Sequence, residues 1–153
     1  MSIKKIALGL VLATTPAYAA QQKDVAELLK AMRSDKKTEV TKSVYNNEIV
    51  FANRLLNKKI GDSDYRISDT YKKGEKSQIQ IDIFKEGLLI ETFTDKGLDG
   101  IVEDHMLNKE WKVMENNDGT NKYISTFGND RTKSNQRFIA TIQDILKIYK
   151  RTN

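Results

Sequence analysis

The chain has 153 residues, with 26 Lys or Arg against 21 Asp or Glu, a net charge of +5 and no cysteine. The lack of cysteine excludes disulfides, a lipid anchor on cysteine, thiol catalysis and zinc sites built from thiolates. Acidic and basic residues are interleaved without a block of five or six like charges, so we do not expect nucleic acid as a partner.

The first nineteen residues have the three-part pattern of a secretory signal peptide. A short basic start precedes an apolar run over residues 6–13, and Ala17 and Ala19 occupy the positions that a signal peptidase recognises. We expect cleavage after Ala19 and a mature periplasmic or secreted chain, residues 20–153. The apolar run is shorter than the roughly 20 residues of a membrane span and no second run follows, so we expect no transmembrane span after cleavage.

Two amphipathic helices are predicted near the new N-terminus. The first covers about 21–33, where apolar residues recur at helical spacing: Val25, Leu28, Leu29 and Met32. The second covers roughly 39–57, with a stripe formed by Tyr45, Ile49, Ala52 and Leu56. The β-branched residues at its start leave a strand over 38–46 as the alternative.

From residue 64 the apolar period changes to two, which is typical of half-buried strands. Ile79, Ile81 and Ile83 alternate with polar residues, and Gly- or Asn-containing turn signals recur at short intervals. The predicted strands lie near 65–71, 77–84, 88–94, 100–107, 110–115 and 122–127. Short connections require antiparallel pairing of neighbours, which gives an up-and-down meander.

The chain ends with a predicted helix that Ser134 can cap. Its apolar residues keep helical spacing to the end: Phe138, Ile139, Ile142, Ile145, Leu146 and Tyr149. We therefore predict a single α+β domain over 20–153. Its architecture is an antiparallel up-and-down meander of five or six strands, covered on one face by N- and C-terminal helices.

The most distinctive motif is D-x-G-x-D-G-x-x-E, formed by Asp95, Asp99, Gly100 and Glu103. It resembles the calcium loops of EF-hands, dockerins and thrombospondin-type repeats, which share a D-x-[DN]-x-[DN]-G core. The resemblance implies that Asp95 and Asp99 are ligands and that Gly100 makes the sharp turn. It further implies that Ile101 offers its carbonyl and that Glu103 binds calcium directly or through water.

Two positions depart from the calcium-loop pattern. Gly97 stands where an acid or amide ligand is expected, and Met106 stands where the closing Glu would be. The flanking segments are predicted as strands rather than helices. A plain hairpin turn, in which Asp and Gly are common, explains the same residues and stays open as the alternative. Calcium is the one cofactor that the sequence indicates.

His105 is the only histidine of the chain. On the predicted strand 100–107 it shares a face with Glu103, so the two could form an acid–base pair at a sheet surface. A buried structural role is the alternative. The sequence contains no G-x-S-x-G and no phosphate-binding loop, so it assigns no catalytic residue beyond the candidates Glu103 and His105.

These observations favour a small exported, non-catalytic binding or interaction module. Its partner would be an envelope protein, a glycan or a small ligand, and its predicted binding surface is the sheet face around Gln78, Gln80 and Asp82. One alternative is an extracytoplasmic hydrolase that uses Glu103, His105 and nearby carboxylates. The other is a structural protein with a calcium-stabilised loop at 95–104. The sequence leaves the ligand and the oligomeric state open.

Overall fold

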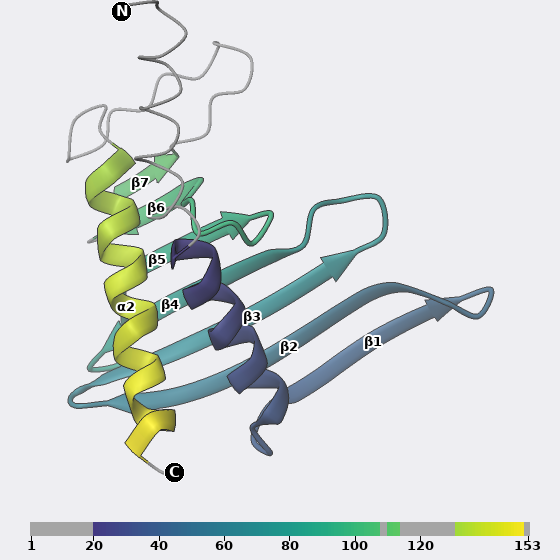
Figure 1. Ribbon diagram of the computed structural model, residues 1–153, viewed down its shortest axis with the longest axis horizontal. Coiled ribbons are helices and arrows are strands. Elements are labelled where there is room, and N and C mark those ends of the chain that lie inside the picture. The colour runs from purple at the N-terminus through teal and green to yellow at the C-terminus, as the bar shows by residue number, and fades with distance from the viewer. Residues whose placement is uncertain (1–19, 108–109, 114–130, 152–153) are drawn as a thin grey trace, which may run out of the picture.

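The protein consists of an antiparallel sheet with two helices packed on one of its faces (Figure 1). The computed structural model describes residues 20–107, 110–113 and 131–151. Seven strands follow one another in the sheet in chain order, each antiparallel to the next. They are β1 (Glu39–Tyr45), β2 (Glu48–Ile60), β3 (Ser63–Lys72), β4 (Gln78–Lys85), β5 (Leu88–Lys96), β6 (Asp104–Leu107) and β7 (Glu110–Val113).

The helices come from the two ends of the described chain. The N-terminal helix covers 20–34, and α2 covers Arg131–Arg151. Both cross the same face of the sheet (Figure 1). This confirms the predicted α+β class with its meander. Within the described ranges, no helix is both long and apolar enough to cross a membrane. The predicted leader, residues 1–19, and the predicted strand 122–127 lie outside the described residues.

The segment 39–57, predicted as a second helix, forms β1 and most of β2 instead. The helical stripe was misleading because residues four apart, such as Ala52 and Leu56, share a face in a strand as well as in a helix. Both of these side chains are buried on the helix-covered face. The turn at Asn46 and Asn47 decides between the two structures. Both residues have positive φ angles, 49° and 63°, which suit a tight hairpin. The strand alternative over 38–46 corresponds to β1.

Two further boundaries differ from the prediction. The strand expected over 100–107 begins only at Asp104, because residues 97–103 form a loop. Helix α2 begins at Arg131, so Ser134 is not its N-cap; it is buried and contacts a strand instead. The strands predicted at 65–71, 77–84, 88–94 and 110–115 correspond to β3, β4, β5 and β7.

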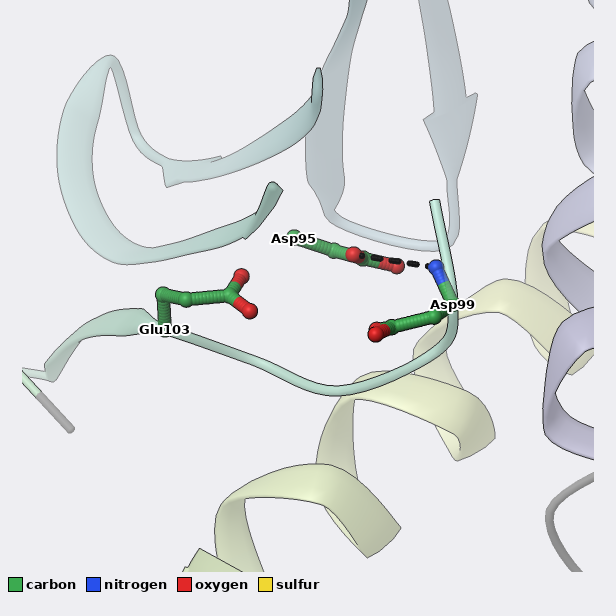
Figure 2. A group of neighbouring side chains, drawn as sticks. All are labelled: Asp95, Asp99 and Glu103. Atoms are coloured by element: carbon green, nitrogen blue, oxygen red, sulfur yellow. Dashed lines mark hydrogen bonds between the residues drawn. The ribbon is translucent and has the colours of Figure 1, made fainter. Parts of the chain in front are cut away.

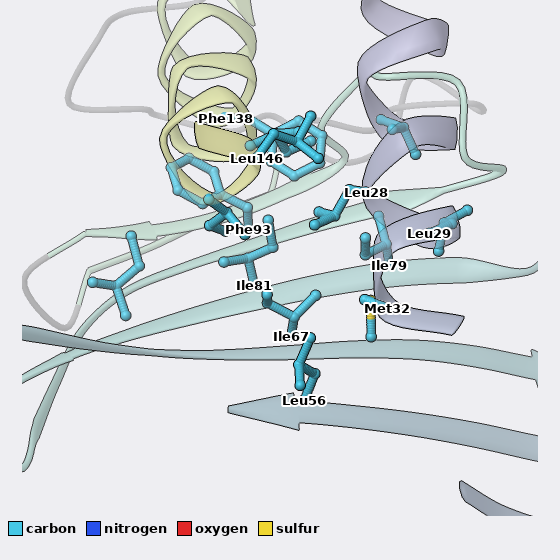
Figure 3. Packing of buried hydrophobic residues seen from close by; sticks show 14 of the residues in the cluster. Leu28, Leu29, Met32, Leu56, Ile67, Ile79, Ile81, Phe93, Phe138 and Leu146 are labelled. Atoms are coloured by element: carbon cyan, nitrogen blue, oxygen red, sulfur yellow. The ribbon is translucent and has the colours of Figure 1, made fainter. Parts of the chain in front are cut away.

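The core lies between the two helices and the inner face of the sheet (Figure 3). The fully buried side chains come from every layer: Leu28 and Met32 from the N-terminal helix, Phe138, Ile142 and Ile145 from α2, and Leu56, Ile67, Ile79, Ile81 and Phe93 from the strands. Burial of a side chain of this size contributes about 1.5–3 kcal/mol. In a chain without disulfides, this layer carries the stability of the fold.

Asp35 joins the end of the N-terminal helix to both other parts of the fold. Its Oδ2 accepts hydrogen bonds from Lys58 Nζ of β2 at 2.5 Å and from the Tyr149 hydroxyl of α2 at 2.9 Å. Its Oδ1 accepts from the backbone N–H of Lys37 at 2.9 Å. The Lys58 hydrogen bond, opposed by burial, lowers the pKa of Asp35 to about 2. The carboxylate is therefore charged and is bound by β2, by α2 and by the turn that follows the N-terminal helix.

Replacing Asp35 by Asn is expected to lower the free energy of unfolding at pH 7 by about 1–2 kcal/mol. Because the pKa of Asp35 in the folded protein lies below its ordinary value, this contribution is complete above about pH 4. It is lost as the pH falls toward 2, so the difference between wild type and Asp35→Asn shrinks over that range. Urea titrations at several pH values measure it.

The matched control is Asp62→Asn, which removes a pair between two exposed side chains, Asp62 and Lys85. We expect no measurable change there, because exposed ion pairs contribute little. Two outcomes would contradict the stabilising role of the Asp35 charge. One is an equal loss of unfolding free energy in the two variants, and the other is a loss in Asp35→Asn that stays the same between pH 5 and pH 2.

Candidate functional site

The predicted acidic motif forms a compact loop at the end of β5. Both oxygens of the Asp95 carboxylate accept backbone hydrogen bonds from inside the loop, from Gly100 N at 2.8 Å and from Asp99 N at 3.2 Å. Asp99 Oδ1 in turn accepts from Ile101 N at 2.9 Å. These bonds fold residues 95–101 around the Asp95 side chain.

The loop brings its three acidic side chains together (Figure 2). Asp95, Asp99 and Glu103 each offer a carboxylate oxygen, and these oxygens lie within 4.8 Å of one another. Asp95 is fully buried, Glu103 is 5% exposed and Asp99 is half-buried. The structure therefore unites the three acidic candidates of the motif. Ile101 lies in the same loop, and a ligand role for its carbonyl stays a prediction.

Burial and mutual repulsion disfavour the negative charges of the acidic loop. Burial raises the pKa of Asp95 to about 6, and the nearby Asp99 charge adds to this, while the backbone hydrogen bond from Gly100 opposes it. Glu103 Oε2 accepts a hydrogen bond from Lys96 N at 2.5 Å. Three acids held this close favour a cation among them, and oxygen donors are the ligands that calcium takes in proteins.

The loop is anchored to the rest of the fold by backbone contacts. Val102 N donates to Asn135 Oδ1 of α2 at 2.8 Å, and Glu103 N donates to Thr94 O of β5 at 2.9 Å. Gly100 lies directly against Gln21 of the N-terminal helix. Both helices and the sheet therefore fix the position of the three carboxylates.

His105 belongs to a second buried polar network, between the sheet and α2. Its Nε2 lies 2.8 Å from Glu91 Oε1, and its Nδ1 lies 2.8 Å from Ser134 Oγ. Arg137 donates to both oxygens of Glu91, through Nη2 at 2.8 Å and through Nε. The imidazole also stacks on Phe93, with 4.5 Å between ring centroids.

This network keeps Glu91 ionised inside the protein. Burial alone would raise the pKa of Glu91, but hydrogen bonds from His105 and Arg137 outweigh it and lower the pKa below its ordinary value. A carboxylate can only accept, so His105 Nε2 donates to Glu91 Oε1, and Nδ1 lies within hydrogen-bond distance of the Ser134 hydroxyl. The network links β5, β6 and α2.

Glu103 and His105 do not lie on an open sheet surface, where the sequence placed them. Glu103 precedes β6 and contacts the backbone of the acidic loop, whereas His105 lies in β6 and faces Glu91 and Ser134. Both side chains are buried. No sequence pattern predicted the partners of His105, Glu91 and Ser134. One weak signal lies in α2: Ser134, which contacts His105, and Arg137, which contacts Glu91, are three residues apart and so lie on one side of the helix.

Strands β1, β2 and β3 extend beyond the N-terminal helix (Figure 1). On the helix-covered side of this part of the sheet, their side chains line a cavity. Its volume is about 730 Å³. Among its lining residues are the apolar Ile49 and Tyr71, 42% and 39% exposed, and the basic Arg33, Lys42 and Arg54. This cavity was not predicted from the sequence, because a helix over 39–57 would not form the strands that line it.

Replacing Gly100 by Ala tests how tightly the acidic loop is held. Gly100 has a φ of +84°, and an added Cβ would lie 2.8 Å from Gln21 Cβ and 3.0 Å from Gln21 C. We expect Gly100→Ala to lower the unfolding free energy by about 3 kcal/mol, from backbone strain together with the clash. Thermal or urea unfolding measures it.

Gly74→Ala provides a matched control for backbone strain. Gly74 has nearly the same φ, +83°, but nothing lies within 4 Å of its added Cβ. Gly74→Ala should lower the free energy of unfolding by about 1 kcal/mol. If the two alanine variants lose equal stability, the close contact between Gly100 and Gln21 does not hold the loop.

Comparisons with protein-family models, with curated proteins and with solved structures found no match to this chain. Three features of the described structure bear on its function. These are the acidic loop, the His105 network and the cavity beside β1–β3.

Proposed function

We propose that the protein is a small exported, non-catalytic binding module whose ligand site is the cavity beside β1–β3. The observation that carries this proposal is the cavity of about 730 Å³ with exposed apolar and basic side chains on its wall. Exposed apolar surface gathered at a concave site is typical of binding sites. The signal-peptide pattern of residues 1–19 supports export to the periplasm or the medium.

The charges around the cavity favour an anionic group on the ligand. Arg54 is paired with Asp69, with 2.8 Å between Nη1 and Oδ2, so this cation is already neutralised. Arg33 and Lys42 form no ion pair within the described part of the chain. The ligand class that fits is one with an apolar part and a negative charge. Such a ligand could be an envelope-protein segment or a small amphipathic molecule.

The opposite face of the sheet fits a binding role less well. Gln78, Gln80 and Asp82, which the sequence placed at the binding surface, are half-buried. Gln80 Nε2 and the Thr92 hydroxyl both donate to Asp82 Oδ1 at 2.9 Å. Because the polar groups of Gln80, Asp82 and Thr92 already bind one another, this face offers fewer free hydrogen-bonding groups to a ligand.

The hydrolase alternative gains little support from the geometry. A general acid or base must come within hydrogen-bond reach of the substrate, directly or through one water. His105 is fully buried and Glu103 is 5% exposed, and both already have hydrogen-bond partners. We therefore favour the binding module.

Binding of an anionic apolar dye, 8-anilinonaphthalene-1-sulfonate, tests the cavity. We expect the folded wild-type protein to enhance the fluorescence of the dye. In the double variant Ile49→Asp, Tyr71→Asp the dye should bind roughly tenfold more weakly, a loss of about 1.4 kcal/mol, because two apolar contacts become negative charges. A fluorescence titration gives the dissociation constants, and near-UV circular dichroism confirms that each variant is folded.

The control for the dye experiment is Leu88→Asp. Leu88 is a strongly exposed apolar residue in the β4–β5 hairpin that does not line the cavity. Its substitution should leave dye binding unchanged. Equal dye binding by wild type, the double variant and Leu88→Asp would remove the cavity as the ligand site.

A second candidate role is structural calcium binding by the loop at 95–104. The observation that favours it is the convergence of the Asp95, Asp99 and Glu103 carboxylates. The donor set fits a hard cation with oxygen ligands, and weak extracellular calcium sites have dissociation constants of about 0.1–1 mM. In this role, the ion would stabilise the junction of the loop with both helices.

Thermal melts with calcium and with a chelator test this role. At 10 mM calcium, a site with a dissociation constant of about 1 mM adds about 1.4 kcal/mol, which raises the melting temperature by a few degrees. Asp99→Asn should abolish this rise, whereas Asp64→Asn, an acid of β3 outside the loop, should keep it. Equal melting temperatures with calcium and with chelator would exclude the ion.

A further inference from the structure

The strand β1 is an open edge of the sheet (Figure 1). Within the described part of the chain it pairs with β2 alone, and all seven of its residues, Glu39–Tyr45, are exposed. Alternate residues of an edge strand direct their backbone N–H and C=O groups away from the sheet, where nothing pairs with them. An extended segment of another chain can use these groups to add a strand.

The side chains of β1 specify what such a segment should carry. Val40, Lys42 and Val44 alternate, so they share one face of the strand. That face is the cavity side, because Lys42 lines the cavity and pairs with Ala52, which also lines it. Val40 and Val44 are 52% and 62% exposed. The strand therefore presents an apolar, basic, apolar series.

We propose that β1 accepts an extended segment of a partner protein as an additional strand, and that this segment carries an acidic residue between two apolar ones. The acid would lie opposite Lys42, and the apolar residues opposite Val40 and Val44. Such cross-strand pairs, apolar with apolar and basic with acidic, are the favourable ones. This proposal rests on the binding role proposed above and names a partner for the edge strand that borders the cavity.

A second copy of the chain fits this edge poorly. Antiparallel pairing of β1 with itself that sets Val40 opposite Val44 also sets Lys42 opposite Lys42, and like charges directly opposite each other are destabilising. Shifting the register by one residue turns the side chains to the other face of the sheet. Lys42 therefore opposes self-association while it favours an acidic partner. Arg33, on the cavity wall, adds a second positive charge on this side.

Two peptides with blocked termini test the proposal, TVTETVT and TVTKTVT. Titrations of the full folded protein, followed by amide NMR shifts, should show the glutamate peptide binding roughly five-fold more tightly than the lysine peptide. The shifts should concentrate on residues 39–45. Lys42→Glu should reverse the preference, so that the lysine peptide binds more tightly. Lys59→Glu, an exposed charge change elsewhere on β2, should leave the preference unchanged.

The outcomes separate this proposal from the binding role on which it rests. If the two peptides bind equally, or if Lys42→Glu does not reverse their order, strand addition to β1 is wrong. If at the same time the cavity variants lose dye binding as predicted, the binding role itself stands. A dimer in sedimentation experiments that protects the β1 amides from exchange would assign the edge to a second copy and overturn the proposal.

Discussion

The two helices cover only part of the face on which they pack, and most other features of the molecule follow from this mismatch. Strand β2 has 13 residues, which corresponds to about 43 Å at 3.3 Å per residue. Two helices packed side by side, each about 10 Å across, cover roughly half of that length. The apolar residues under the helices form the core. Beyond them, β2 and β3 continue with the exposed Ile49 and Tyr71, β1 adds the exposed Val44, and the cavity lies there.

Three carboxylates that lie wholly or partly inside the protein are stabilised in three different ways. Asp35 has a cation and a tyrosine hydroxyl as partners, and its pKa falls. Glu91 is bound by an imidazole and a guanidinium, and its pKa falls as well, against the effect of burial. Asp95 has only backbone N–H groups among its recorded hydrogen bonds, with another acid nearby, and its pKa rises. Of the three, Asp95 is the carboxylate whose ionised form a bound cation would stabilise most.

The sequence predicted those features that depend on residues close together in the chain. The meander follows from the alternation of Ile79, Ile81 and Ile83, and the acidic loop is local, so its residues converge as predicted. The helix predicted over 39–57 was wrong because residues spaced by four share a face in a helix and in a strand alike, and the turn at Asn46 and Asn47 together with the pairing of β2 with β3 favours the strands. The partners of His105 come from β5 and α2, at sequence separations of 14 and 29, and no local pattern connects them.

A long open edge strand normally endangers a protein, because it invites pairing with other copies of the same chain. A lysine in the middle of such a strand is one common protection. In β1, Lys42 stands between two exposed valines, so its charge penalises self-pairing at the register where the apolar contacts would be best. The same charge lowers the free energy of pairing with an acidic segment. In the proposed binding role, one side chain would therefore both oppose aggregation and select the partner, so the exposed edge and the proposed function are compatible.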